Sequence, residues 1–171
     1  RPPLMPAPTG FEPLAGWRGE GLAAPLQVAH SAMALPAPHL SHPDEPLLAI
    51  GAHLLTMDFM LPEIRFKGNA YGAGCTHQSL DGVMILSAYR DPRIFETVET
   101  FQRAAEFVKH AAWSQEDVDR GIIGVARRDE KPLRPAEATA VALTRHHIGN
   151  TLERRLERRR RLLQATPEEV K

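Results

Sequence analysis

Two hydrogen-bond donors bracket a glycine-rich segment near the middle of the chain. Arg65 precedes Gly68, and Tyr71 directly precedes Gly72. A guanidinium and a phenol that face the same peptide carbonyl can bind it, or stabilise the oxyanion of a tetrahedral intermediate. A turn with an aromatic side chain packed against it is the alternative interpretation, and the spacing alone favours that alternative about threefold. The spacing therefore leaves both interpretations open: donors that support catalysis, or a turn with a packed aromatic side chain.

Histidine is the other residue type here that could do chemistry, since neutral imidazole is a common zinc ligand. The sequence has eight histidines, and the closest pairs are His39 with His42 and His146 with His147. Prolines bracket the first pair, adjacent side chains on a helix point about 100° apart, and no carboxylate or cysteine completes either set. No His-x-x-Glu-His helix is present. We therefore expect this chain to bind no metal and no cofactor of its own.

The arginines of residues 154–161 form a local basic run, which could indicate nucleic-acid binding. Glu153 and Glu157 interrupt the run, and no aromatic residues interleave for base stacking. A solvated helix face is the preferred interpretation because an apolar stripe occurs at helical spacing. The residues of that predicted inner stripe are Ile148, Leu152, Leu156 and Leu163. The pattern predicts no nucleic-acid partner.

Composition excludes several further classes of protein. Lysine plus arginine and aspartate plus glutamate both total 21, so the formal net charge is zero and no global field attracts nucleic acid or anionic lipid. The only cysteine, Cys75, is expected to be a small packed residue, and a disulfide framework is excluded. Prolines and acidic residues interrupt the most apolar region, so we expect no membrane span. Localisation stays open.

The element pattern predicts one α+β domain over residues 21–171, preceded by a proline- and glycine-rich linker over residues 1–20. A strand is expected over residues 27–35. Residues 47–61 have helical periodicity, and Pro62 is expected to bend or end that helix, with a separate turn over residues 63–65.

A hairpin is expected next, with strands over residues 71–77 and 82–89. Gly72 and Gly74 within the first of these strands indicate a close approach by another backbone, so this strand is where a bound extended chain is expected. The second strand is apolar on both faces, which predicts a central position in the sheet.

The remaining residues predict helices. One follows Pro92, and a second is capped by Ser114 with Asp117. The predicted inward residues of the first are Ile94, Val98, Phe101, Ala105, Val108 and Ala112. A third starts near Pro135 and a fourth runs over residues 151–164. Thr166 and Pro167 start a last helix close to the end of the sequence, from which we expect the chain to be a segment of a longer polypeptide.

The succession of motifs resembles the late part of presequence proteases, a branch of the pitrilysin/insulinase zinc metallopeptidase family. The match begins with Asp44-Glu45-x2-Leu48 and continues through Phe59-x-Leu-x-Glu-Ile-Arg-x-Lys-Gly68-x-Ala-Tyr-Gly-x-Gly74 and Ser87-x-Tyr-Arg-Asp-Pro92. It covers roughly residues 27–171. Asn69 is a departure, because relatives usually have a second glycine there.

The resemblance implies a clamshell of four related domains with a LuxS/MPP-like metallohydrolase fold, in which zinc and its ligands belong to the amino-terminal half of the same polypeptide. This chain would then be part of the carboxyl-terminal, zinc-free half and inactive alone. By analogy, Arg65 and Tyr71 would contact an unstructured peptide substrate and support the transition state, and Gly68 and Gly72 would permit its approach.

Two other functions remain open: a non-proteolytic homologue that serves as a structural subunit, and a nucleic-acid module. The resemblance also implies a further helix and strand after Lys171. A sheet edge left unpaired without them would favour self-association.

Overall fold

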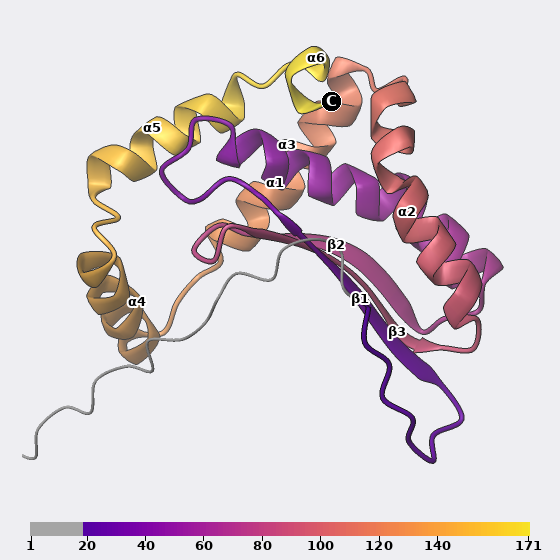
Figure 1. Ribbon diagram of the computed structural model, residues 1–171. Helices are drawn as coiled ribbons and strands as arrows, with labels where there is room; N and C mark the ends of the chain where they lie inside the picture. Colours follow the sequence, from indigo (N-terminus) through magenta and orange to yellow (C-terminus); the bar gives the residue numbers. More distant parts are fainter. Residues whose placement is uncertain (1–18) are drawn as a thin grey trace, which may run out of the picture.

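The computed structural model describes residues 19–171, so the predicted linker over residues 1–20 lies almost wholly outside the described residues. Helices pack on one side of a small antiparallel sheet (Figure 1). The elements follow in this order: β1 (Ala29–Pro36), α1 (Glu45–Leu55), η1 (Thr56–Lys67), β2 (Gly72–Gln78), β3 (Val83–Asp91), α2 (Ile94–His110), α3 (Gln115–Asp129), α4 (Pro135–His147), α5 (Leu152–Leu163) and α6 (Pro167–Val170). The predicted α+β class is confirmed.

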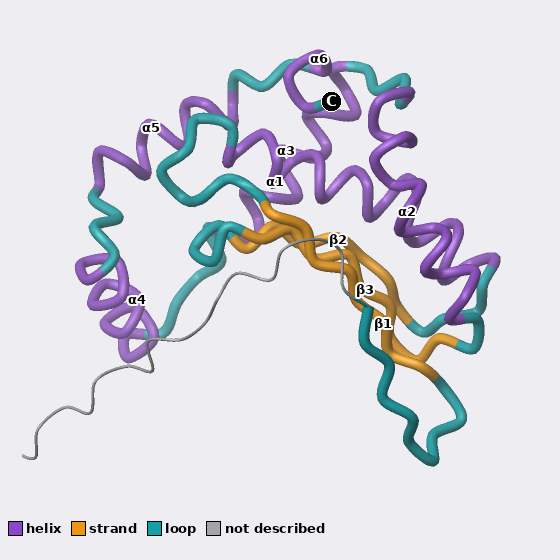
Figure 2. The backbone as a smooth tube through the Cα atoms, in the orientation of Figure 1, coloured by secondary structure: helices purple, strands orange, loops and turns teal. Residues whose placement is uncertain are grey.

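The sheet has the order β1-β3-β2, so the expected central position of β3 is confirmed. Both neighbours pair with β3 antiparallel, and His30 and Gly72 both lie opposite Tyr89. Figure 2 shows α1 and α2 on one side of the strands. Leu86 and Cys75 are buried and point to that side. The residues that precede and follow them along β3 and β2 point to the other side and are exposed or half-buried. We call the two sides the helix-covered face and the open face.

The apolar run after Pro43 folds as one continuous helical segment, α1 followed by η1. The helix does not end at Pro62, where the sequence pattern allowed an end, and no separate turn forms over residues 63–65. A proline ring clashes with the carbonyl four residues earlier in an α-helix. The segment is instead a π-helix, in which hydrogen bonds span five residues and the backbone is wider. The segment therefore runs on to Lys67 and sets where β2 begins.

By length and composition, the segment Glu45–Lys67 is apolar enough to cross a membrane. Half of its most apolar window is buried inside the protein. Its apolar side chains take part in both hydrophobic clusters of the described residues. Packing against the sheet and the other helices therefore accounts for its composition.

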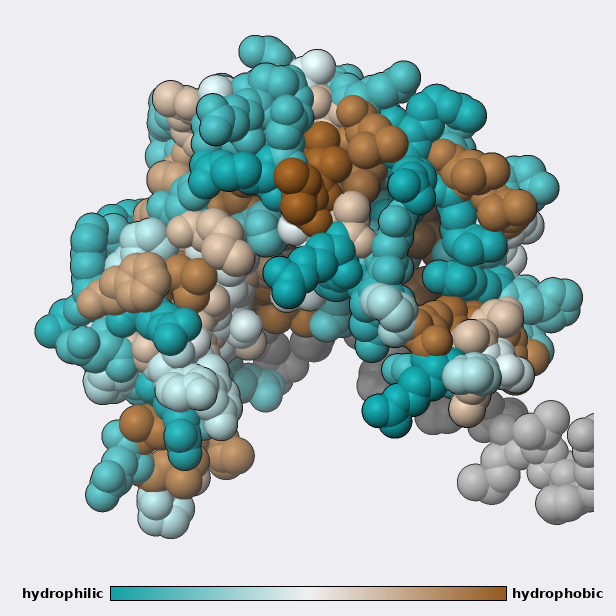
Figure 3. Space-filling model, turned by 180° about the vertical axis from the view of Figure 1, so that it is seen from behind, coloured by the Kyte–Doolittle hydropathy of each residue, from teal (hydrophilic) through white to brown (hydrophobic). Residues whose placement is uncertain are grey.

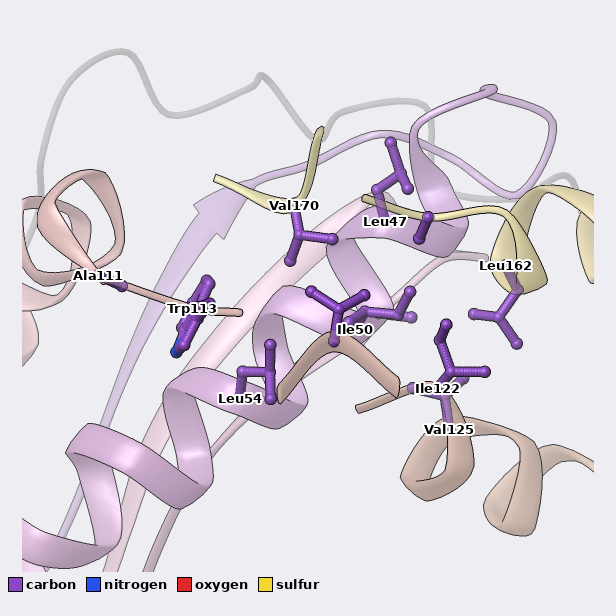
Figure 4. Packing of buried hydrophobic residues seen from close by; sticks show 12 residues of the cluster. Leu47, Ile50, Leu54, Ala111, Trp113, Ile122, Val125, Leu162 and Val170 are labelled. Carbon is purple, nitrogen blue, oxygen red and sulfur yellow. The ribbon is translucent and has the colours of Figure 1, made fainter. Parts of the chain in front are cut away.

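Two apolar clusters hold the layers together. In the first, Ile50 and Leu54 of α1 pack with Val118 and Val125 of α3, as Figure 4 shows in part. A Cβ on Gly121 would lie 2.8 Å from Ile50, so glycine allows the two helices to approach closely. The second cluster joins the helix-covered face to α1, η1 and α2. Each large side chain buried there contributes about 1.5–3 kcal/mol.

The predicted inner stripe of α5 is wrong. Leu152, Leu156 and Leu163 are 54%, 52% and 59% exposed, whereas Leu162 is 4% exposed. The helix is turned so that Arg158 and Leu162 face α1, because Arg158 pairs with a buried carboxylate on that helix. α4 buries none of its side chains. Viewed from behind, brown apolar residues are visible among polar ones on the side where α4 and α5 lie (Figure 3).

Candidate functional site

The turn between η1 and β2 places the predicted site residues. Gly68 is buried, and a Cβ there would lie 2.5 Å from the carbonyl oxygen of Ile64, so only glycine fits. Asn69 follows with φ 63°, the left-handed conformation that glycine and asparagine adopt most readily. The Asn69 amide donates to the Arg65 carbonyl at 3.0 Å, which closes the turn. Asparagine therefore suits this position, where the turn requires a left-handed backbone.

Arg65 lies in the last turn of η1 with an exposed side chain. Its guanidinium carbon is 5.9 Å from the ring centroid of Phe66, which is itself 68% exposed. Among the described residues this guanidinium has no ion pair or hydrogen bond, so its donors point to solvent and remain available to a ligand.

Tyr71 lies just before β2 and is 67% exposed. Its ring meets that of Tyr89 edge to face, with centroids 5.8 Å apart. The guanidinium carbon of Arg90 is 5.9 Å from the Tyr71 centroid and 5.8 Å from the Tyr89 centroid. On the far side of Tyr89, the His30 ring packs edge-on at 4.7 Å. We call these four side chains the tyrosine cluster.

Sequence reasoning did not single out Tyr89, Arg90 and His30 as site residues. Tyr89 and Arg90 stand within the motif that carries the family resemblance, but nothing local predicts their contact with Tyr71. That contact depends on the register, which sets His30 and Gly72 opposite Tyr89 from the two neighbouring strands. The structure brings Tyr71 into this cluster and Gly72 opposite Tyr89, whereas Arg65 and Gly68 lie at the end of η1 and in the turn that follows.

Gly72 contributes open space. A Cβ built on it would meet no heavy atom within 4 Å, in contrast to Gly68. The next row along the open face consists of Ala32, Ser87 and Gly74, which are all small. Among the described residues, the open face therefore has small side chains in the row next to the tyrosine cluster, and the surface there is shallow.

The outer edge of β2 is partly covered. The Thr56 hydroxyl of η1 accepts the Cys75 amide hydrogen at 2.8 Å and lies 3.3 Å from the Cys75 carbonyl oxygen. The Cys75 side chain is 8% exposed, and burial raises the pKa of this thiol from 9.0 to about 12. The prediction that Cys75 is a packed residue is confirmed, and η1 pairs part of the edge that would otherwise favour association.

A second polar cluster lies on the helix-covered face, and two of its members, Glu45 and His77, are buried. The Glu45 side chain, 4% exposed, accepts from Arg158 Nε at 2.5 Å, and Arg158 also donates to Asp129 at 2.7 Å. Burial opposes the charge of Arg158, but its bonds to Glu45 and the charge of Asp129 outweigh that effect and raise the pKa of Arg158. His77 Nε2 is 2.8 Å from the Pro38 carbonyl oxygen, so it must donate, and Nδ1 faces Glu45 at 4.0 Å.

The histidine pairs do not form a ligand set. The His39 ring packs over Gly82, while His42 accepts the Asp44 amide hydrogen at 3.2 Å. The rings of His146 and His147 lie 5.9 Å apart on α4. Within residues 19–171, no three histidine, cysteine, aspartate or glutamate side chains are grouped so that they could hold a metal ion. The described residues therefore offer no fit for a zinc ion.

Taken together, the exposed donors lie at one end of the sheet. Tyr71 is held beside Arg90 at the start of β2, and Arg65 is exposed at the end of η1, so the hydroxyl of Tyr71 and the guanidinium of Arg65 are the donors considered. Such groups can bind and polarise a carbonyl oxygen that approaches the open face, but nucleophile activation needs a base or metal from elsewhere.

Residues 26–171 match the PreP C-terminal domain family. The chain is 32% identical over 151 residues to the mitochondrial presequence protease of Eremothecium gossypii, which covers 88% of this chain and 15% of that protein. It is 33% identical over 147 residues to the presequence protease of Yarrowia lipolytica, covering 86% of this chain and 14% of that protein. The chain thus spans about one seventh of the length of these relatives.

Solved structures share the fold at low identity. A protease from Helicobacter pylori superposes with a TM-score of 0.69 at 16% identity, over 86% of this chain and 38% of that one. An inactive peptidase domain from Bordetella parapertussis gives 0.67 at 19% identity, over 86% of both chains. The M16 peptidase inactive domain from Pseudomonas fluorescens gives 0.64 at 17% identity, over 82% of this chain and 36% of that one. The chain therefore belongs to the PreP C-terminal domain family and has the fold of M16 peptidase inactive domains.

Proposed function

We propose that this chain is the non-catalytic carboxyl-terminal domain of a zinc metalloendopeptidase that degrades unstructured peptides. On this proposal the domain closes the chamber against the amino-terminal half of the same polypeptide, which carries the zinc and its ligands. Arg65 and Tyr71 contact the substrate near the scissile bond, and Gly68 and Gly72 permit its approach.

The observation that carries the proposal is the exposure of donors beside small residues on the open face, within the described part of the chain. Tyr71 is 67% exposed although aromatic side chains are usually buried, and Gly72 beside it leaves open space. A peptide in extended conformation fits a sheet face with low side chains, and its carbonyls need donors of this kind. Gly68 has an additional role, because the turn itself requires it.

Peptidase activity of the full-length protein tests the proposal. Tyr71→Phe and Arg65→Ala are expected to lower kcat about 100-fold on a quenched unstructured peptide, since each removes a donor to the developing oxyanion. Lys67→Ala is the matched control, because Lys67 is exposed in the same turn and pairs with Glu63. It is expected to leave kcat unchanged.

Two other results would change the assignment. Unchanged turnover in both variants would remove Arg65 and Tyr71 from the site. A full-length protein that folds and binds zinc, yet cleaves no unstructured peptide, would favour the alternative function of a non-proteolytic structural subunit.

A further inference from the structure

Arg90 has an unusual backbone conformation. Its φ is 51°, in the left-handed region that non-glycine residues with long side chains seldom adopt. The surrounding bonds hold it there: the Tyr71 amide donates to both the Tyr89 carbonyl at 3.1 Å and the Arg90 carbonyl at 3.3 Å. Next to it, Asp91 Oδ1 accepts the Arg93 amide hydrogen at 2.8 Å. Strain of this kind persists where the neighbourhood enforces it, and it is concentrated at functional sites.

The side chain of Arg90 is directed at aromatic rings rather than at a carboxylate. Its guanidinium carbon lies within 6 Å of the centroids of both Tyr71 and Tyr89. Within residues 19–171 it forms no ion pair, although most arginines of α5 do. The chain has only two tyrosines, and Arg90 contacts both.

We propose that Arg90 is a positioning residue for Tyr71, and this inference rests on the proposed function. An exposed tyrosine would otherwise sample several side-chain rotamers, and only one of them can place its hydroxyl on a substrate carbonyl. The guanidinium over the ring and the edge of Tyr89 beside it restrict Tyr71 to one orientation. Arg90 acts through Tyr71 and does not itself touch the reacting atoms.

The test is a double-mutant cycle in the full-length peptidase. Arg90→Gln is expected to lower kcat about tenfold with little change in KM, because the cation–π contact with the Tyr71 ring no longer holds the phenol. In the Tyr71→Phe background the same substitution is expected to have almost no effect on kcat, because no hydroxyl remains to be positioned. Additive losses would overturn the inference.

Conservative and relaxed variants separate positioning from simple stability. Arg90→Lys keeps a cation near the rings and is expected to retain a kcat between those of the parent and Arg90→Gln. Arg90→Gly removes the side chain and the strained φ together, so kcat is expected to fall as in Arg90→Gln while the unfolding temperature does not fall. A lower unfolding temperature in proportion to the loss of kcat would overturn the inference in favour of a structural role.

The matched control is Arg93→Gln, because the Arg93 side chain is also exposed and follows the same strand. It is expected to leave kcat unchanged. If Tyr71→Phe lowers kcat while Arg90→Gln does not, the positioning role fails and the proposed function stands. If Tyr71→Phe itself has no effect, the proposed site fails, and the positioning role fails with it.

Discussion

Arginines on the two faces of the sheet have different neighbours. On the helix-covered face, Arg158 reaches Glu45 and Asp129 and is only 23% exposed. At the end of the open face, Arg90 contacts the rings of Tyr71 and Tyr89 and forms no ion pair within the described residues. The first arginine neutralises a buried carboxylate, whereas the second lies against the rings of two exposed tyrosines.

The difference separates groups that hold the fold from groups that are available for function. A buried charge must be paired, because removing one partner leaves the other desolvated without compensation. Exposed cations near aromatic rings contribute little to stability and can be replaced without unfolding the protein. Stability measurements can therefore test the contrast between the two faces.

The largest effect is expected for Arg158→Ala. It leaves the carboxylate of Glu45, 4% exposed, without its partner, and should lower the free energy of unfolding by about 3 kcal/mol. Urea unfolding measures this change. Arg160→Ala, which removes an exposed pair with Glu157, is the control and should cost less than about 0.5 kcal/mol. Equal losses in the two variants would contradict the contrast.

Thr56→Val should have an intermediate effect. Its hydroxyl accepts the Cys75 amide hydrogen at the edge of β2, and valine keeps the shape but leaves that amide without a partner. The expected loss is about 1–2 kcal/mol. Because the edge becomes less protected, sedimentation should also show more association than in the parent protein. Unchanged stability and a monomeric profile across concentrations would show that η1 does not guard this edge.

Arg90→Gln should change stability less than Arg158→Ala or Thr56→Val. The cation–π contacts of an exposed arginine are worth about 0.5–1 kcal/mol each, and losing them is partly offset because the polar side chain stays solvated. We expect a loss below about 1 kcal/mol by urea unfolding. A loss as large as that of Arg158→Ala would place Arg90 with the structural charges and remove the difference between the faces.

The smallest effect on stability is expected from the surface carboxylate of Asp117, and this effect depends on pH. Hydrogen bonds from the Ser114 amide and hydroxyl, helped by Arg120, lower the pKa of Asp117 from 3.8 to about 2. A lowered folded-state pKa means that this capping contribution is present above about pH 4 and is lost as pH falls through 2. In Ser114→Ala, the carboxyl titration followed by NMR should move back toward 3.8.

Local signals predicted the elements that local forces form. Ser114 with Asp117 predicted the start of α3, and the structure has both hydrogen bonds of that capping box. The hairpin strands also followed from the turn-like residues between them, and the central position of β3 followed from its apolar run. The predicted inner residues of α2 were only partly right, since Thr97 and Ala104 are buried and Ala105 is exposed.

The residues of the candidate site show the same difference between what local motifs predicted and what depends on pairing between strands. Arg65 and Tyr71 were predicted through the family resemblance, and both side chains are exposed, Arg65 at the end of η1 and Tyr71 just before β2. Tyr89, Arg90 and His30 were missed as site residues, because their contact with Tyr71 arises from pairing between strands. The rotation of α5 was missed because Glu45 and Arg158 are far apart in sequence, and their pairing outweighs the leucine stripe.

The sequence by itself determined the helix starts, the hairpin and the family, since capping, turn chemistry and motif order act over a few residues. Only the tertiary structure decided that Pro62 widens a helix without ending it, which side of α5 faces α1, and that Arg90 lies over both tyrosines. Those outcomes depend on which distant groups must be paired, packed or hydrogen-bonded once water is excluded, and no local pattern encodes that choice.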